Sequence, residues 1–325
     1  MMKRLVSFFG EHNEVFDRLN EEAKEYAASK GIEYVWSIQK PFDRENVIAE
    51  LNRSDAGLID VEPYNEEIFS RMDPRCRLLI RFGVGFDAVD LEAASRHGIS
   101  ITRTTGANCT GVAEMALLHI LAAGRQLFIN RGVIESGVWE KNIGRELRLK
   151  KVGILGFGAV GRSLARLLQG FECEILAYDT FKNEEAAKEL NVRFADLDEI
   201  FTTCDAISVH LPYLPETHHL VDAHRLGQMK KEAVITCTAR GNIVDEDALY
   251  DALKEGKILG AGLDVFSKEP LNADSRLLEL PNLILTPHVA SQTYESLWNI
   301  YKKAIDICSD FYEGKELGRG DLLNP

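Results

Sequence analysis

The sequence predicts an α/β protein of two domains, each built on a parallel sheet. Three observations support this prediction. The chain has 325 residues, which is more than one hydrophobic core usually holds. Short runs rich in Val, Ile, Leu and Phe alternate with helical stretches along most of its length. A glycine-rich turn at 156–161 lies mid-chain between an apolar strand and a helix.

The first hundred residues alternate strand and helix without a phosphate-binding loop. We expect strands at Arg4–Phe8, Ile32–Trp36, Ala56–Ile59, Leu78–Ile80 and Ile99–Thr102. We expect helices at Asn13–Ser29, Arg44–Asn52, Asn65–Met72 and Leu91–His97. Gly83 and Gly85 follow the fourth strand, where they either leave the backbone open to a ligand or only turn the chain.

The most apolar stretch of the chain, Asn108–Arg125, predicts a long helix with Asn108 as its N-cap. Because it is apolar nearly all round, we expect it to be buried at a domain junction or in a subunit interface. The mixed, basic stretch Arg131–Arg148 predicts a loop-rich surface connection.

The central glycine turn predicts a dinucleotide-binding site. A strand at Val152–Leu155 precedes it, a helix from Ala159 to Leu168 follows, and a second strand at Glu174–Tyr178 ends at Asp179. The helix amino terminus, which includes Ala159 and Val160, favours a phosphate anion. The spacing G-x-G-x-x-G provides a tight turn, close backbone approach and close helix packing, at Gly156, Gly158 and Gly161 respectively.

Asp179 also predicts which dinucleotide binds. A carboxylate accepts hydrogen bonds from both ribose hydroxyls of NAD, whereas the 2′-phosphate of NADP would meet a like charge. That repulsion is on the order of 4 kcal/mol at 4 Å for an effective dielectric constant near 20. We therefore expect NAD.

Beyond Asp179, chemically capable side chains follow successive strands. Strands expected at Ala206–His210, Ala233–Thr236, Leu259–Leu263 and Leu283–Leu285 precede loops that contain His210–Leu211–Pro212, Thr238–Ala239–Arg240–Gly241, Asp264 and Pro287–His288. In an open parallel sheet, ligands bind beyond the carboxyl ends of the strands. A final amphipathic helix is expected at Tyr294–Gly314.

These loops contain the groups that a nicotinamide-dependent reduction of a 2-oxo acid requires. His288 can donate a proton, and Glu269, held before Pro270, can orient it. Arg240 can bind a carboxylate and a carbonyl oxygen with its planar fork. Asp264 is a candidate for binding the nicotinamide amide. Each residue alone is more simply read as an ordinary surface or loop residue; their common position after strands of one sheet favours the catalytic reading.

Composition and charge disfavour other classes of function. A net charge of −13 and a pI near 5.2 disfavour nucleic acid and anionic membranes as partners. No apolar run is long enough to span a membrane, and the start of the chain predicts a strand, so we expect a cytoplasmic protein. The six cysteines lack disulfide or zinc spacing, and no carboxylate or cysteine completes a metal site around His218, His219 and His224.

Over nearly its whole length the chain resembles the D-isomer-specific 2-hydroxyacid dehydrogenase family. Seven motifs occur in the order of that family: RFGVGFDAVD (81–90), TTGANCTGVAE (104–114), GILGFGAVG (153–161), VHLPYLPET (209–217), TARGNIVDEDAL (238–249), GLDVFSKEP (262–270) and TPHVAS (286–291). The resemblance implies an NAD-dependent dehydrogenase that interconverts small 2-oxo acids and (R)-2-hydroxy acids. It also implies a homodimer built around the Asn108 helix.

The resemblance assigns roles residue by residue. It implies the catalytic set Arg240, Glu269 and His288, and substrate binding by Gly83, Val84 and Gly85 together with Arg240 and His288. The implied cofactor-binding residues are Asn108, Val112, Gly156, Gly158, Ala159, Val160, Gly161, Asp179, His210, Leu211, Pro212, Thr217, Thr238, Ala239 and Asp264. It implies a Rossmann NAD-binding domain at 104–290, inserted into a flavodoxin-like substrate domain of residues 1–103 and 291–325.

Two alternatives stay open. D-3-phosphoglycerate dehydrogenases of this family usually have an Arg–Ser pair after the third strand, whereas this chain has Asp60, Val61 and Glu62, which would repel a phosphate. The other alternative is an NAD-sensing binding protein like the C-terminal-binding corepressors. That role favours an exposed apolar groove on the first domain, and the sequence shows no obvious one.

Overall fold

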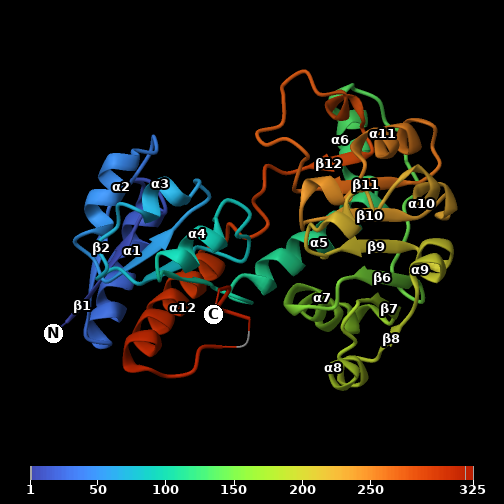
Figure 1. Cartoon of the computed structure of the whole chain (residues 1–325). Coiled ribbons are helices and arrows are strands. Elements are labelled where there is room, and N and C mark those ends of the chain that lie inside the picture. Colours follow the sequence, from blue (N-terminus) through green and yellow to red (C-terminus); the bar gives the residue numbers. More distant parts are fainter. Residues whose placement is uncertain (1, 319, 325) are drawn as a thin grey trace. The chain divides into compact units, whose positions relative to one another are not determined.

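The structure, a computed structural model, describes residues 2–318 and 320–324. The chain divides into two units: unit 1 is Met1–Asn108 with Thr293–Pro325, and unit 2 is Cys109–Gln292. Figure 1 labels most of their elements. The domain boundaries expected from the sequence, 103/104 and 290/291, fall within five residues of these divisions.

Unit 1 is a parallel five-stranded sheet in the order β2-β1-β3-β4-β5. This is the flavodoxin-like order, whose topological switch point lies between β1 and β3. The strands are β1 (Lys3–Ser7), β2 (Ile32–Trp36), β3 (Ala56–Ile59), β4 (Leu78–Arg81) and β5 (Ser100–Arg103). The helices are α1 (Glu14–Ser29), α2 (Arg44–Leu51), α3 (Glu66–Phe69), α4 (Leu91–Arg96) and α12 (Tyr294–Glu313).

The last helix, α12, completes unit 1 although it is nearly 200 residues away from β5 in sequence. It packs beside α1, where Tyr26 donates a hydrogen bond to Asp306 (2.7 Å) and Tyr294 donates one to Glu22 (2.7 Å). The ring of Tyr301 is fully buried against the sheet. Burial of the apolar side chains of α12 in the core of unit 1 stabilises the attachment of this C-terminal helix to the N-terminal part of the chain.

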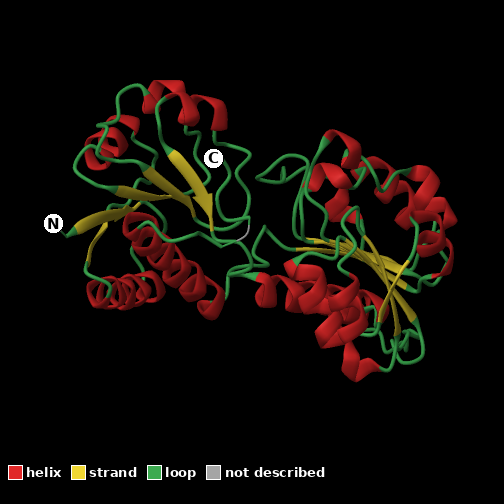
Figure 2. Ribbon diagram, turned by 60° about the horizontal axis from the view of Figure 1, so that its bottom comes forward, coloured by secondary structure: helices red, strands yellow, loops and turns green. Residues whose placement is uncertain are grey.

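Unit 2 is a parallel seven-stranded sheet in the order β12-β11-β10-β9-β6-β7-β8, which is the Rossmann order. Helices flank each sheet in Figure 2. The strands are β6 (Lys151–Leu155), β7 (Glu174–Tyr178), β8 (Val192–Phe194), β9 (Ala206–Val209), β10 (Val234–Cys237), β11 (Gly260–Leu263) and β12 (Leu283–Leu285). The helices are α5 (Cys109–Gly124), α6 (Leu127–Glu135), α7 (Ala159–Leu168), α8 (Glu184–Glu189), α9 (Leu197–Thr203), α10 (Ala223–Gln228) and α11 (Glu246–Lys254). The predicted fold class is confirmed.

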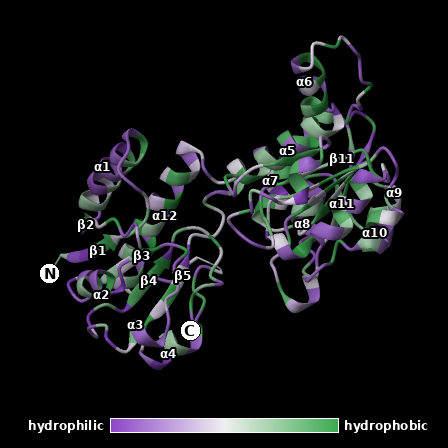
Figure 3. Cartoon of the chain, turned by 90° about the horizontal axis from the view of Figure 1, so that it is seen from above, coloured by the Kyte–Doolittle hydropathy of each residue, from purple (hydrophilic) through white to green (hydrophobic). Residues whose placement is uncertain are grey.

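The apolar helix α5 lies against β10 and β11, and its ribbon is mostly green in Figure 3. Ala113, Ala116 and Ile120 are fully buried, whereas Leu118 is exposed. Within the described residues, no single helix has the length and apolar composition needed to cross a membrane. Helices α5 and α6 reach that length and composition only as a pair bent by 56°.

Two elements differ from the sequence-based expectation. Helix α6 replaces part of the loop expected at Arg131–Arg148, and strand β8 was not predicted. None of the residues of α6 is buried, so the helix turns no apolar face to the core. A helix without such a face lacks the periodic apolar pattern by which helices are predicted. Strand β8 has only three residues, too few for an alternating pattern to stand out.

Candidate functional site

The glycine turn between β6 and α7 fits a dinucleotide because its three glycines leave space in three different ways. Gly156 has φ +98°, and a Cβ there would lie 2.8 Å from the carbonyl of His210. A Cβ on Gly161 would lie 2.1 Å from the carbonyl oxygen of Gly156. A Cβ on Gly158 would meet nothing within 4 Å, so this side of the turn is open to a phosphate.

Asp179 lies at the end of β7, and its carboxylate is fixed by backbone donors. The Phe157 N–H donates to Oδ2 (2.7 Å) and the Phe181 N–H donates to Oδ1 (2.9 Å). The carboxylate is therefore tied to the glycine turn itself, at the position that the ribose hydroxyls of a bound dinucleotide require.

The loop after β9 packs over the same turn. The imidazole of His210 lies between two hydroxyls, with Nε2 2.8 Å from Ser208 Oγ and Nδ1 3.4 Å from Thr238 Oγ1. Burial lowers the pKa of His210 to about 4, so the ring is neutral near pH 7. Thr217 closes the loop, since its hydroxyl donates to the carbonyl of Pro212 (2.7 Å).

The remaining cofactor-binding candidates lie at four places along the chain. Ala159 and Val160 begin α7, and Leu211 is buried directly after His210. Ala239 is the neighbour of Arg240, to whose side chain its carbonyl is bonded. Val112 is buried in the first turn of α5. Asn108 is the last residue of unit 1, immediately before that helix.

Glu269 and His288 form the predicted pair. His288 Nδ1 lies 2.8 Å from Glu269 Oε2, and the other carboxylate oxygen accepts the N–H of Phe266 (3.0 Å). With the carboxylate held at both oxygens, the imidazole is oriented through Nδ1. The His288 side chain is 48% exposed, which leaves it accessible to a ligand.

Arg240 follows β10, on a loop that is packed against the Glu269 loop. Gly241 makes this packing possible, because a Cβ there would lie 1.9 Å from the carbonyl carbon of Phe266. Arg240 Nη1 donates to the Ala239 carbonyl (2.7 Å), which directs the guanidinium along its own loop. The backbone of Phe266 therefore lies close to Gly241, the residue after Arg240, and its N–H group donates a hydrogen bond to Glu269.

Asp264 has a structural task that the sequence did not suggest. It is fully buried, its carbonyl accepts the His288 N–H (2.8 Å), and its carboxylate accepts the N–H groups of Val289 and Ala290 (both 2.9 Å). Thr286 donates its hydroxyl to the same carboxylate (2.6 Å). Both carboxylate oxygens are therefore engaged with the loop of His288, and the binding of a nicotinamide amide by Asp264 stays a prediction.

In unit 1 the glycine loop follows β4. Gly83 has φ +108°. Its N–H donates to the Thr104 hydroxyl (3.0 Å), and its carbonyl accepts the backbone N–H of Thr104 (3.0 Å). The next residues, Val84 and Gly85, are half-buried. The loop is thus held at its base while its tip is only partly covered.

The two carboxylates after β3 are in different surroundings. Asp60 is 9% exposed and lies 3.7 Å from the Arg81 guanidinium, whereas Glu62 is half-buried. Burial raises the pKa of both carboxyls, and the charge of Arg81 opposes that rise at each. Asp60 therefore already has a cationic partner, and the expected repulsion of a phosphate by the two carboxylates stays a prediction.

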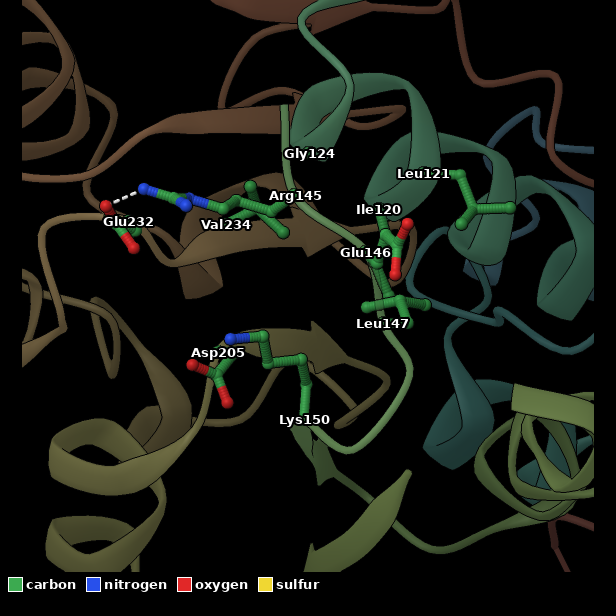
Figure 4. A pocket seen from close by; sticks show the side chains of 10 residues that line it. All are labelled: Ile120, Leu121, Gly124, Arg145, Glu146, Leu147, Lys150, Asp205, Glu232 and Val234. Carbon is green, nitrogen blue, oxygen red and sulfur yellow. Dashed lines mark hydrogen bonds and ion pairs between the residues drawn. The ribbon is translucent and has the colours of Figure 1, made fainter. Parts of the chain in front are cut away.

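Figure 4 shows a separate pocket in unit 2, lined by α5 and by the amino-terminal ends of β9 and β10. Arg145 and Glu232 form an ion pair in it, and Asp205 is paired with Lys230 (3.0 Å). Ligands of open parallel sheets bind at the carboxyl ends of the strands. This pocket is at the opposite edge and is not the dinucleotide site.

Residues 117–290 match the model of the D-isomer specific 2-hydroxyacid dehydrogenase NAD-binding domain. The D-3-phosphoglycerate dehydrogenase of Archaeoglobus fulgidus is 34% identical over 88% of this chain, which spans 54% of that protein's length. The glyoxylate reductase of Korarchaeum cryptofilum is 34% identical over 81% of both chains.

A solved structure of D-lactate dehydrogenase from Aquifex aeolicus, complexed with NAD and lactic acid, has 28% identity, a TM-score of 0.80 and 99% coverage of both chains. The matched domain and this neighbour confirm the prediction of NAD as cofactor. Proteins of this kind are oxidoreductases that act on CH–OH groups. The chain therefore belongs to the D-isomer specific 2-hydroxyacid dehydrogenase family, and its second unit is the NAD-binding domain of that family.

Proposed function

We propose that this protein transfers a hydride reversibly between NADH and a small, unphosphorylated 2-oxo acid, giving the (R)-2-hydroxy acid. The observation that supports this most directly is the Glu269–His288 pair at 2.8 Å, on loops that follow neighbouring strands of the NAD-binding sheet. The glyoxylate reductases among the relatives support a small acid as substrate.

In this proposal His288 is the proton donor for reduction. Its Nδ1 faces Glu269, so Nε2 is the atom that gives a proton to the carbonyl oxygen and takes it back during oxidation. The negative charge of Glu269 stabilises the protonated imidazole. Bound NADH supplies the hydride.

Two groups are proposed to bind the acid. Arg240 offers a planar set of donors for the carboxylate and the carbonyl oxygen. The backbone N–H groups of Val84 and Gly85 are the second carboxylate-binding element, on a loop braced by Thr104.

The carboxylates after β3 support an unphosphorylated substrate. The guanidinium of Arg81 lies 3.7 Å from the Asp60 carboxylate, so the positive charge of Arg81 is already compensated by Asp60. Glu62 adds a second negative charge beside this pair. A phosphate dianion would meet net repulsion. The Archaeoglobus relative favours the alternative activity, D-3-phosphoglycerate dehydrogenase, and the substrate test below distinguishes the two.

We also propose a homodimer built around α5 and the segment that follows it. Large apolar side chains are exposed there, among them Trp139 at 85% and Ile143 at 81%. An exposed cluster of this kind is characteristic of a subunit interface. A cytoplasmic location is part of the same proposal, supported by six unpaired cysteines.

The first prediction concerns the cofactor. Replacing Asp179→Ser together with Thr180→Arg should shift the kcat/KM ratio of NADPH to NADH upward by about a hundredfold, ~2.8 kcal/mol, because a repulsive charge is replaced by a phosphate partner. Steady-state kinetics with both nucleotides measure this ratio. Thr180→Arg alone keeps the carboxylate and should keep the preference for NADH. A wild-type enzyme that uses NADPH better than NADH would show that the ribose assignment is wrong.

The second prediction concerns the proton donor. Glu269→Gln removes the charge that stabilises protonated His288, so the pH above which reduction fails should move lower, and kcat at neutral pH should fall by about 10- to 100-fold. The pH dependence of reduction is the measurement. Glu255→Gln removes a surface carboxylate paired with Lys257 and serves as the control. An unchanged pH profile in Glu269→Gln contradicts the pairing.

The third prediction concerns the substrate. Wild type should reduce glyoxylate or pyruvate with a higher kcat/KM than 3-phosphohydroxypyruvate. Glu62→Gln, which leaves the Asp60–Arg81 pair intact, should raise kcat/KM for the phosphorylated acid about three- to tenfold, and 1 M salt should reduce that gain because screening shortens to about 3 Å. Glu92→Gln, at an exposed position of α4, is the control. Wild-type preference for the phosphorylated acid overturns the proposal in favour of D-3-phosphoglycerate dehydrogenase.

The fourth prediction concerns assembly. Light scattering after size exclusion should give twice the chain mass for wild type. Trp139→Asp with Ile143→Asp should give the monomer mass, because charges replace apolar contact. Leu278→Asp places a charge on an exposed leucine elsewhere in unit 2 and should leave the mass unchanged. A monomeric wild type at micromolar concentration contradicts the proposed dimer.

A further inference from the structure

A buried histidine on α5 is not used by the proposed reaction. His119 is 1% exposed and lies over β11 at Gly262, where a Cβ would come within 2.6 Å of the imidazole. The glycine leaves the space that the ring occupies. The neighbouring side chains of α5, such as Ala116 and Ile120, belong to an apolar core, so a histidine in this position needs a specific explanation.

Both ring nitrogens of His119 face threonine hydroxyls. Nδ1 lies 3.1 Å from Thr236 Oγ1 on β10, and Nε2 lies 3.3 Å from Thr286 Oγ1 after β12. Thr286 gives its single hydroxyl proton to Asp264, since an ionised carboxylate only accepts. The proton between Thr286 and the ring must therefore be on Nε2, and Nδ1 accepts the hydroxyl proton of Thr236.

This arrangement requires a neutral ring. Burial lowers the pKa of His119 to about 4, although the charge of Asp264 opposes that shift. The hydroxyls of Thr236 and Thr286 and the carboxylate of Asp264 are the polar groups that face it from β10 and from the ends of β12 and β11. The direction of each hydrogen bond is thus the same throughout the neutral pH range.

The chain of bonds ends at His288. Asp264 holds the backbone N–H groups of residues 288, 289 and 290, as described above. His288 has φ +53°, the left-handed region that residues other than glycine rarely adopt, and such a residue persists only where its surroundings fix it. Thr286 lies two residues before it, bonded to both Asp264 and His119.

We propose that His119 is a positioning residue for the reaction: with Thr286 it fixes Asp264, whose carbonyl holds the His288 N–H and whose carboxylate holds the next two N–H groups, so that the His288 imidazole meets Glu269. This inference rests on the proposed function of His288 as the proton donor. A ring that only filled space would need no particular proton position, whereas each bond in this chain has a defined donor and acceptor.

Thr286→Val tests the chain of bonds, because valine keeps the shape and removes the hydroxyl. We expect amide hydrogen exchange at residues 288–290 to become about tenfold faster, kcat for reduction to fall about tenfold and KM for NADH to change less than twofold. The pH at which reduction fails should move lower. Thr286→Ser keeps the hydroxyl and should restore most of the exchange protection, the rate and the pH profile.

His119→Leu should change exchange and kcat in the same direction, and the double variant with Thr286→Val should be little worse than either single variant, since both act through one chain. Thr202→Val removes a hydroxyl bonded only within α9, and His224→Asn changes an exposed histidine; both should behave as wild type. Measuring Tm for every variant separates loss of folding from loss of positioning.

Three results would overturn the inference: unchanged exchange at 288–290 in Thr286→Val, equal effects of Thr286→Val and Thr286→Ser, or a lower Tm with the wild-type pH profile. Exchange does not depend on catalysis. Faster exchange in Thr286→Val together with an unchanged pH profile in Glu269→Gln would instead contradict the role of Glu269 in the proposed function and leave the positioning of the loop supported.

Discussion

The parallel register of the seven-stranded sheet is the constraint on which the site depends. Val152 is aligned with Ala206, Ala206 with Val234, and Val234 with Gly260, so neighbouring strands begin together. Strands of similar length then end together, and the loops that leave them share one edge. The residues of that edge are distant in sequence and become neighbours for this reason: Gly156, His210, Arg240, Asp264 and His288.

Sharing an edge is not sufficient, because each loop must also be held. Two glycines provide the first means: Gly156 allows the His210 loop, and Gly241 allows the Phe266 loop, to approach closer than any side chain would permit. Backbone N–H groups provide the second. Phe157 donates to Asp179, Phe266 to Glu269, and Ala290 to Asp264. Each of these acids thus has a backbone donor that costs no side-chain entropy to hold in place.

The sequence was sufficient to predict what local patterns encode. Apolar strands, glycine spacing and polar residues after strands indicated both sheets and the Glu269–His288 pair, which the structure places at 2.8 Å. It was insufficient where the surroundings of a residue depend on a partner that is distant in sequence. Arg81 compensates the charge of Asp60 from 21 residues away, and Asp264 accepts hydrogen bonds from a loop that begins some 24 residues later. His119 had no signal, because a single histidine in an apolar helix carries no spacing. Thr286, directly before Pro287–His288, was the residue of this hydrogen-bonded chain whose position in the sequence came nearest to indicating it.

Three histidines around this sheet lie in different surroundings although their side chains are identical. His119 and His210 each lie between two hydroxyls, and burial lowers the pKa of each to about 4. His288 is about half exposed and bonded to a carboxylate. A proton added to either buried ring would reverse a hydrogen bond in the frame that holds the loops. Keeping those two rings neutral lets the frame retain one arrangement while His288, in the proposed reaction, gains and loses a proton in every turnover.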